Sequence, residues 1–178
     1  MKNFNYKIIK TLPLIEGIEF LLSLKKTTTR KFIMANLIKT NPSCVCCEVK
    51  ATKLCLGEDS AGGLHWDFYN DEDIALTWDH IIPKSKGGNN TLSNSQVLCK
   101  KHNEFKSNND DRIFVLKTLY ENGINYQLET KKKSKPSFRV EYWKSLDFEI
   151  FKKLEKLITE QSSIDEDCGE QYVYYFNK

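Results

Sequence analysis

An α+β fold is predicted by three features of this chain of 178 residues. Two short segments near its middle alternate apolar and polar residues, which is typical of antiparallel strands buried on one face. Segments on both sides of them repeat apolar residues at helical spacing. Two pairs of cysteine or histidine residues, far apart in the sequence, have the spacing of metal ligands, so one ion can join the two ends of a small domain.

Composition fits a folded protein rather than a disordered one, with 40% hydrophobic and 29% charged residues. No apolar run approaches the roughly 20 residues that cross a bilayer, and the first residues lack the apolar core of a secretory signal. We therefore expect an intracellular protein without membrane contact. The spacing of the six cysteines favours metal binding over disulfide bonds.

The net charge of +3 is distributed unevenly along the chain. Residues 2–31 and 131–144 are basic, with net charges of +5 each, whereas residues 48–73 carry a net charge of −5. Basic segments on both sides of the middle of the chain fit a phosphate-rich partner. Charge that only solvates an exposed face explains any single one of these runs equally well.

Two strands are predicted at residues 64–69 and 74–79, joined by the polar turn 70–73. Glycine and asparagine residues indicate a loop over residues 84–94. A short helix is expected over residues 99–107. The local order is therefore strand, strand, loop, helix.

Helices are predicted on both sides of these strands. Apolar residues recur at helical spacing over residues 29–41, 111–121 and 148–159. The apolar segment 12–26 fits either a helix or a strand. The basic stretch 131–136 has the composition of a linker, and the acidic tail after Glu160 is expected to be irregular, although residues 172–176 can pair as a strand.

Two pairs of residues have the spacing of zinc ligands. Cys44 and Cys47 are separated by two residues, as are Cys99 and His102, and three cysteines with one histidine are a common tetrahedral set. Cys46 can replace either of its cysteine neighbours, but it is too close to chelate comfortably beside them. The remaining thiols are expected to be ordinary: Cys46, Cys55 and Cys168.

A group of catalytic type follows the second predicted strand. Asp79 and His80 lie just before Pro83 and a Gly-Gly loop, an arrangement that presents the end of a strand at the surface. Oxygen ligands from aspartate and asparagine suit Mg2+, and a neutral imidazole is a competent general base. Asn94 can orient that imidazole through its second nitrogen.

Strand geometry raises a question about this pair. In a regular strand Asp79 and His80 point to opposite faces, and His80 shares its face with apolar residues. Either the strand twists or frays before Asp79, or one of the two residues is structural.

The spacing of these residues resembles the HNH endonucleases, which have a ββα-metal fold. The resemblance is carried by Asp79-His80-Ile81-x-Pro83, Gly87-Gly88, Asn94 and Leu98-Cys99-x2-His102-Asn103-x2-Lys106. It covers about residues 44–107 and is similar to the form common in bacteriophage genomes. It implies an HNH core with a structural zinc knuckle at residues 44–107, between a basic helical extension (1–43) and a helical extension with an acidic tail (108–178).

The resemblance implies a metal-dependent DNA endonuclease that hydrolyses phosphodiester bonds. His80 would be the general base, Asp79 and Asn103 would hold one Mg2+ or Mn2+ ion, and Asn94 would hold the loop and orient His80. The structural Zn2+ would be held by Cys44, Cys47, Cys99 and His102. His102 stands where the family usually has a fourth cysteine, and Asn103 is a variant that the family uses for its last histidine.

Double-stranded DNA is the implied partner, and a row of lysines fits its phosphates. The expected contacts are Lys84, Lys86, Lys100, Lys101 and Lys106. One site cuts one strand, so cutting both strands would require a homodimer or two successive nicks. If the gene belongs to a phage, the protein would act in the cytoplasm of a bacterial host.

Two other functions remain open from the sequence. One is a zinc-stabilised DNA-binding protein whose HNH core is catalytically silent; against it, Asp79, His80 and Asn103 are all present. The other is a redox protein based on Cys44 and Cys47, which lacks the expected βαβ context. A homing, a restriction or a packaging role cannot be chosen from the sequence.

Overall fold

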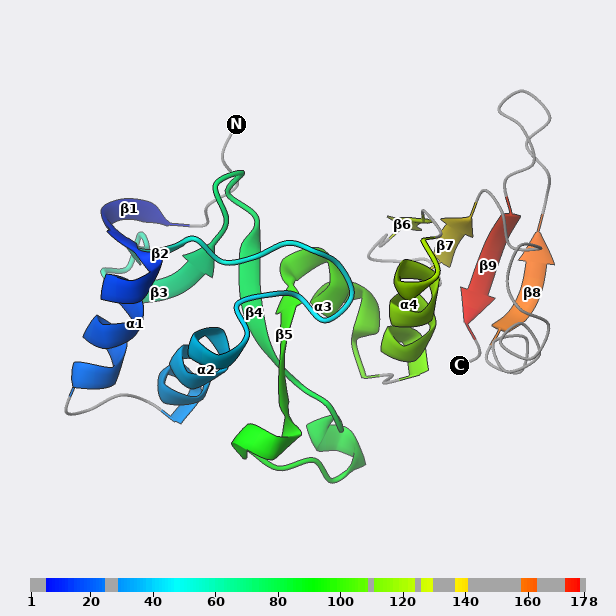
Figure 1. Ribbon diagram of the computed structural model, residues 1–178, viewed down its shortest axis with the longest axis horizontal. Helices are drawn as coiled ribbons and strands as arrows, with labels where there is room; N and C mark the ends of the chain where they lie inside the picture. Colours follow the sequence, from blue (N-terminus) through cyan, green and yellow to red (C-terminus); the bar gives the residue numbers. More distant parts are fainter. Residues whose placement is uncertain are drawn as a thin grey trace. The chain divides into compact units, whose positions relative to one another are not determined.

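The computed structural model (Figure 1) describes residues 6–24, 29–108, 111–123, 126–129, 137–140, 158–162 and 172–176. The chain forms two compact units, Met1–Asn103 and Glu104–Lys178. None of the helices in the described part of the chain has the length and apolar character that crossing a bilayer requires.

The first unit is built on a five-stranded antiparallel sheet in which the strands lie side by side in chain order. Its strands are β1 (Lys7–Pro13), β2 (Lys53–Glu58), β3 (Leu64–Tyr69), β4 (Ala75–His80) and β5 (Ser95–Cys99). Two helices, α1 (Leu14–Ser23) and α2 (Thr29–Thr40), connect β1 to β2. The predicted mixed helix and strand content is therefore confirmed.

The predicted strand pair and the turn between them are confirmed as β3 and β4. The turn is fixed by Asn70, whose side-chain oxygen accepts a hydrogen bond from the Ile74 amide at 2.7 Å, as asparagine often does in turns. The predicted order lacked one strand, however. β5 lies between the loop and the helix α3 (Lys100–Lys106), so the ββα unit consists of β4, β5 and α3.

The N-terminal extension was expected to be helical, but it also contains the strand β1. The ambiguous segment 12–26 contains the end of β1 and all of α1, and β1 pairs with β2 along its length, from Lys7 opposite Glu58 to Pro13 opposite Lys53. This extension therefore contributes a strand to the same sheet as β2 to β5. The predicted helix at 29–41 is confirmed as α2.

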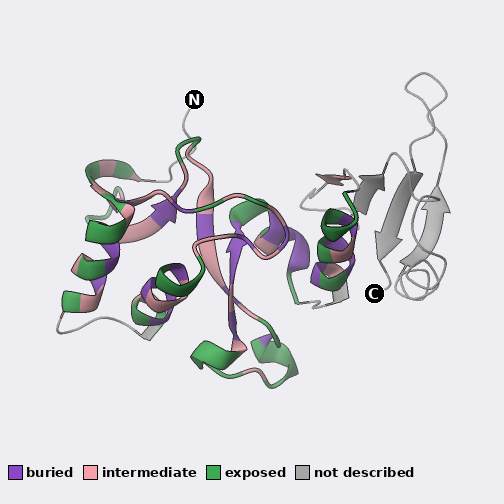
Figure 2. Cartoon of the chain, viewed as in Figure 1, coloured by how far each residue is buried: buried purple, intermediate pink, exposed green. Residues whose placement is uncertain are grey.

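Helices α1 and α2 cover one face of the sheet, as Figures 1 and 2 show. Gly17 permits a close approach of α1, because a Cβ atom there would lie 2.5 Å from the Cβ of Leu54. Farther along α1, the Phe20 ring lies 4.7 Å from the ring of Trp66 on β3. The buried strand residues beneath the helices are Leu54, Phe68 and Leu76. Burying such a side chain stabilises the fold by about 2 kcal/mol.

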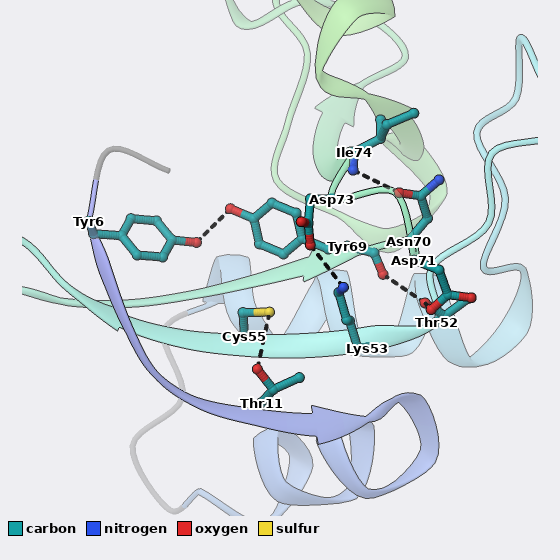
Figure 3. A network of polar contacts seen from close by, with 10 residues as sticks. All are labelled: Tyr6, Thr11, Thr52, Lys53, Cys55, Tyr69, Asn70, Asp71, Asp73 and Ile74. Atoms are coloured by element: carbon teal, nitrogen blue, oxygen red, sulfur yellow. Dashed lines mark hydrogen bonds and ion pairs between the residues drawn. The ribbon is translucent and has the colours of Figure 1, made fainter. Parts of the chain in front are cut away.

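A polar network ties the start of the chain to the middle of the sheet (Figure 3). The Tyr6 hydroxyl donates to Asp67 at 2.8 Å and lies 2.6 Å from the Tyr69 hydroxyl. The pKa of Tyr69 is raised to about 12, and burial is the largest cause. Lys53 forms an ion pair of 2.9 Å with Asp73 in the β3–β4 turn. These contacts fix the turn from which β4 starts.

The second unit contains helix α4 (Asp111–Glu121), which agrees with the predicted helix, and an antiparallel sheet of order β6-β7-β9-β8. Its strands are β6 (Tyr126–Glu129), β7 (Ser137–Val140), β8 (Ile158–Ser162) and β9 (Tyr172–Phe176). The tail after Glu160 was expected to be irregular, with pairing of 172–176 as a possibility; the described part of it forms the end of β8 and all of β9. Of the helix predicted at 148–159, residues 148–157 lie outside the described residues, and the last two belong to β8 instead. The linker predicted at 131–136 also lies outside the described residues.

Candidate active site

Four predicted zinc ligands are brought together from two distant segments. Cys44 and Cys47 lie in the loop after α2, which is attached to β5 by a hydrogen bond of 3.1 Å from the Val45 amide to the Val97 carbonyl. Cys99 ends β5 and His102 lies in the first turn of α3. The ligand atoms of these four residues all lie within 4.8 Å of one another.

The spacing of these atoms fits a tetrahedral zinc ion. His102 Nδ1 lies 3.1 Å from the Sγ of Cys99, 3.4 Å from that of Cys44 and 3.6 Å from that of Cys47. Zinc bonds of about 2.3 Å to sulfur and 2.1 Å to nitrogen, set at tetrahedral angles, put these atoms about 3.6 Å apart. Cys46 is fully buried but lies outside this set of ligands.

Electrostatics of the cluster also favour a cation. Hydrogen bonds, first to Cys46 and then to Cys47 and Cys99, hold the pKa of the Cys44 thiol far below its usual range. The pKa of Cys99 is raised, first by its hydrogen bond to Cys44. Burial lowers the pKa of His102, but hydrogen bonds to Cys44 and Cys47 outweigh burial and raise it to about 9. A thiolate beside a proton-attracting imidazole is an environment in which a metal ion can replace the proton.

At the end of β4 the strand alternation continues without a break. Asp79 pairs with Gln96 of β5 and His80 pairs with Ser95, so the strand does not fray before Asp79. The two side chains therefore lie on opposite faces of the sheet. Asp79 is buried, and its Oδ2 accepts a hydrogen bond of 2.8 Å from Nε2 of the Gln96 side chain.

Asp79 and Asn103 lie beside the same threonine. Thr77 shares a face of β4 with Asp79, because it precedes it by two residues. The Asn103 Nδ2 donates to the Thr77 hydroxyl at 2.8 Å, and that hydroxyl donates to the Leu98 carbonyl at 2.8 Å. A carboxylate and an amide oxygen are thus supplied by β4 and α3, and both are ligands that suit Mg2+.

His80 is held on the other face of β4. Its ring packs on Trp78 with 4.5 Å between ring centroids, and its Nε2 lies 2.8 Å from the Oδ1 of Asn90. Because an amide oxygen only accepts hydrogen bonds, Nε2 is the donor in this pair. Sequence reasoning missed Asn90, since the only signal was its place in an asparagine-rich loop ten residues after His80.

The Asn94 side chain bridges the two arms of the loop between β4 and β5. Its Oδ1 accepts from the Ile82 amide at 2.8 Å, and its Nδ2 donates to the carbonyls of Ile82 at 3.1 Å and Asn89 at 3.0 Å. Gly88 is required beside it, because a Cβ there would lie 1.7 Å from the Ile82 carbonyl oxygen. The loop contains two short 3-10 helices, η1 (Lys84–Lys86) and η2 (Leu92–Asn94).

Most of the lysines expected to contact DNA are exposed. Exposed side chains are found at Lys84, Lys86, Lys100 and Lys101. Lys106 is only 1% exposed, so its ammonium is not presented to a DNA backbone, and the expectation for this residue is not supported. The basic cluster at 131–135 lies outside the described residues.

Comparison with known proteins gives one match. The family model for HNH endonucleases matches residues 70–118, a little over a quarter of the chain, from the turn before β4 into α4. Neither curated proteins nor solved structures give a significant match. The matched segment contains Asp79 and His80 at the end of β4, Asn94 in the loop before β5, and Asn103 in α3. Residues 70–118 of this chain are therefore similar to the HNH endonucleases.

Proposed function

We propose that this protein is a metal-dependent DNA endonuclease that hydrolyses phosphodiester bonds. The observation that carries the proposal is the HNH match over residues 70–118, the segment that holds Asp79, His80 and Asn103. HNH endonucleases as a family act on DNA. The exposed lysines around the ββα unit agree with a phosphate-rich substrate.

His80 is the proposed general base. Its Nε2 donates to Asn90, so the lone pair of the neutral imidazole is on Nδ1, which can accept a proton from water. Packing against Trp78 limits the rotation of the ring. Water deprotonated there would attack the phosphorus atom of the scissile phosphodiester.

Asp79 and Asn103 are the proposed ligands of a catalytic Mg2+ or Mn2+ ion. The fit rests on their oxygen donors and on Thr77, which shares a face with Asp79 and accepts a hydrogen bond from Asn103. When bound, a divalent cation supplies charge stabilisation to the phosphate and to the leaving 3′ oxygen. The hydrogen bond from Gln96 fixes the orientation of the Asp79 carboxylate.

The opposite faces of Asp79 and His80 do not prevent joint action at one phosphate. They are the last two residues of β4, and consecutive Cα atoms are only about 3.8 Å apart. A phosphate at the end of the strand can meet one side chain from each face. DNA would then pass the end of β4, next to the loop that carries Lys84 and Lys86.

Zinc is the proposed ion of the cluster formed by Cys44, Cys47, Cys99 and His102, and its role is structural. Cys44, Cys47, Cys99 and His102 each offer one ligand atom, so together they would supply the four ligands of a closed structural zinc site. Such an ion would join the loop after α2 to the start of α3.

A catalytically silent DNA-binding protein is the alternative. The observation that favours it is the burial of Asp79, 8% exposed and hydrogen-bonded to Gln96, as a purely structural aspartate would be. In that case the protein would bind DNA and zinc without cutting DNA in any divalent metal.

Nicking of supercoiled plasmid separates the two functions. We expect the wild type to nick plasmid with Mg2+ or Mn2+ and to stop when EDTA is added. His80→Ala should lose about 10²–10⁴-fold in rate, because it removes the general base, while it keeps DNA binding and zinc. His65→Ala is the matched control, since His65 lies on β3 and pairs with Asp59 in the turn after β2, and it should nick like the wild type. Full activity in His80→Ala would refute the mechanism.

A further inference from the structure

We propose that Asn90 is a positioning residue for His80. Its side-chain oxygen holds the imidazole with the proton on Nε2 and the lone pair on Nδ1. The proposal rests on the nuclease function proposed above, but the contact can be measured without cleavage. Asn90 is not part of the motif that carries the family resemblance.

The contact joins the end of β4 to the far arm of the loop. Asn90 Oδ1 lies 2.8 Å from His80 Nε2, across ten residues of sequence. The hydrogen bond lies at the surface, where a mobile side chain would lose it to water. It can orient the imidazole only if the backbone of Asn90 is itself held in place.

Both neighbours of Asn90 are held through their carbonyl groups. The Asn89 carbonyl accepts from Asn94 Nδ2 at 3.0 Å, and the Thr91 carbonyl accepts from the Ser95 hydroxyl at 2.6 Å. The Thr91 hydroxyl also donates to the Asn89 side chain at 2.6 Å. Asn90 is therefore clamped on both sides, and Asn94 acts on His80 through Asn89 and Asn90.

The same serine supports the other side of the imidazole. Trp78, whose ring lies 4.5 Å from that of His80, donates from its Nε1 to the Ser95 hydroxyl at 2.8 Å. Ser95 is buried and pairs with His80 across the strands. Ser95 therefore holds both Trp78, on which the His80 ring packs, and Thr91, which follows Asn90 in the loop.

The consequence is a single neutral form of His80. The hydrogen bond made by one ring nitrogen decides which nitrogen carries the proton. With an acceptor at Nε2, the basic lone pair stays on Nδ1. Without that acceptor, both neutral tautomers and several ring orientations would be populated, and only one of them would present its lone pair to water.

Nitrogen-15 NMR of the histidine rings tests the contact directly. The chain has only three histidines, so the His80 signals are assigned by their loss in His80→Ala. In zinc-loaded protein without Mg2+, at a mildly alkaline pH, we expect the proton of His80 on Nε2. In Asn90→Ala the signals should move to a mixture of tautomers, while those of His65 and His102 stay in place.

Nicking kinetics give the second measurement. We expect Asn90→Ala to lower the maximal nicking rate by about 10–100-fold, the range known for lost supporting hydrogen bonds at metal sites. The protein concentration that gives half the maximal rate should change less than about twofold, because in this proposal Asn90 acts on His80 and not on DNA. Ser93→Ala is the matched control, since it removes a contact of 3.0 Å to Thr91 in the same loop and should change neither measurement.

Two results would overturn the proposal: a wild-type His80 with its proton on Nδ1, or an Asn90→Ala protein with unchanged tautomer and rate. A wild type that binds DNA but cuts it in no divalent metal would instead refute the nuclease function. Zinc content and circular dichroism establish that each variant is folded.

Discussion

His102 and Asn103 are consecutive residues of α3 that face different groups of atoms. His102 Nδ1 lies 3.1–3.6 Å from three sulfur atoms, whereas Asn103 donates to Thr77 on β4. Consecutive side chains of a helix point about 100° apart. A zinc ion held by His102 would therefore fix the rotation of α3, and with it the direction in which Asn103 points.

Cys99→Ser tests this link at the level of single residues. We expect it to lower the zinc content from about one ion per chain to near zero and to abolish nicking, because the helix that carries Asn103 loses its anchor. His102→Cys should keep one zinc, since four cysteines are also a tetrahedral set. Elemental analysis and plasmid nicking measure both effects.

The control for the zinc variants is Cys55→Ser, which changes a buried thiol on β2 outside the cluster. Its partner is the Thr11 hydroxyl, 3.8 Å from Sγ. The Cys55→Ser protein should keep the zinc content and the nicking rate of the wild type. A Cys99→Ser protein that retains stoichiometric zinc would contradict the ligand assignment.

The cluster of Cys44, Cys47, Cys99 and His102 could be predicted because the spacing within each pair is local and the chemistry of the residues is specific. Two residues between ligands define each pair, whatever the fold between the pairs. The contact of His80 with Asn90 could not be predicted in this way. It depends on the path of the loop, which contains several asparagines, and the sequence alone does not indicate which of them contacts His80.

At the scale of elements, the strands that could be predicted are those whose sequence alternates regularly between apolar and polar residues. β3 and β4 alternate between apolar and polar residues, whereas β2 and β5 do not. Half of the residues of β2 (KLCLGE) and four of the five residues of β5 (SQVLC) are buried, and the buried residues lie on both faces, so the period of two is lost. The strand β1 was missed because its only neighbour among the described strands, β2, lies at least 40 positions away in the sequence.

Gly88→Ala tests the loop as an element. A Cβ at this position would lie 1.7 Å from the Ile82 carbonyl oxygen and 2.9 Å from Asn94 Nδ2, so the backbone must shift and the bonds between Ile82 and Asn94 must lengthen. We expect the nicking rate to fall by about 10²-fold, as misplacements of about 1 Å do at catalytic sites.

Gly87→Ala is the matched control for that loop. Gly87 has a φ of +87°, but a Cβ there meets nothing within 4 Å. It should cost about 1–2 kcal/mol of stability, from the left-handed backbone alone, and leave the nicking rate near that of the wild type. Thermal melts and plasmid nicking compare the two variants, and equal rates would show that the loop path does not matter for catalysis.

For the whole molecule, the distribution of charge matters more than its sum. The net charge is only +3, yet residues 84–106 hold five lysines against one glutamate. Four of these lysines are exposed in the loop between β4 and β5 and at the start of α3. A DNA backbone that passes the end of β4 would meet the two in the loop, Lys84 and Lys86.

The double substitution Lys84→Ala/Lys86→Ala tests this path, in a His80→Ala background that leaves the DNA intact. Each phosphate contact contributes about 0.9 to the slope of log affinity against log salt concentration. Loss of both lysines should therefore reduce the magnitude of the slope by about 2 and weaken binding to unrelated duplexes to a similar extent. Lys39→Ala, at the exposed end of α2, should leave the slope unchanged. Fluorescence anisotropy of labelled duplexes at several salt concentrations gives the slopes, and an unchanged slope in the double variant would place the DNA elsewhere on the protein.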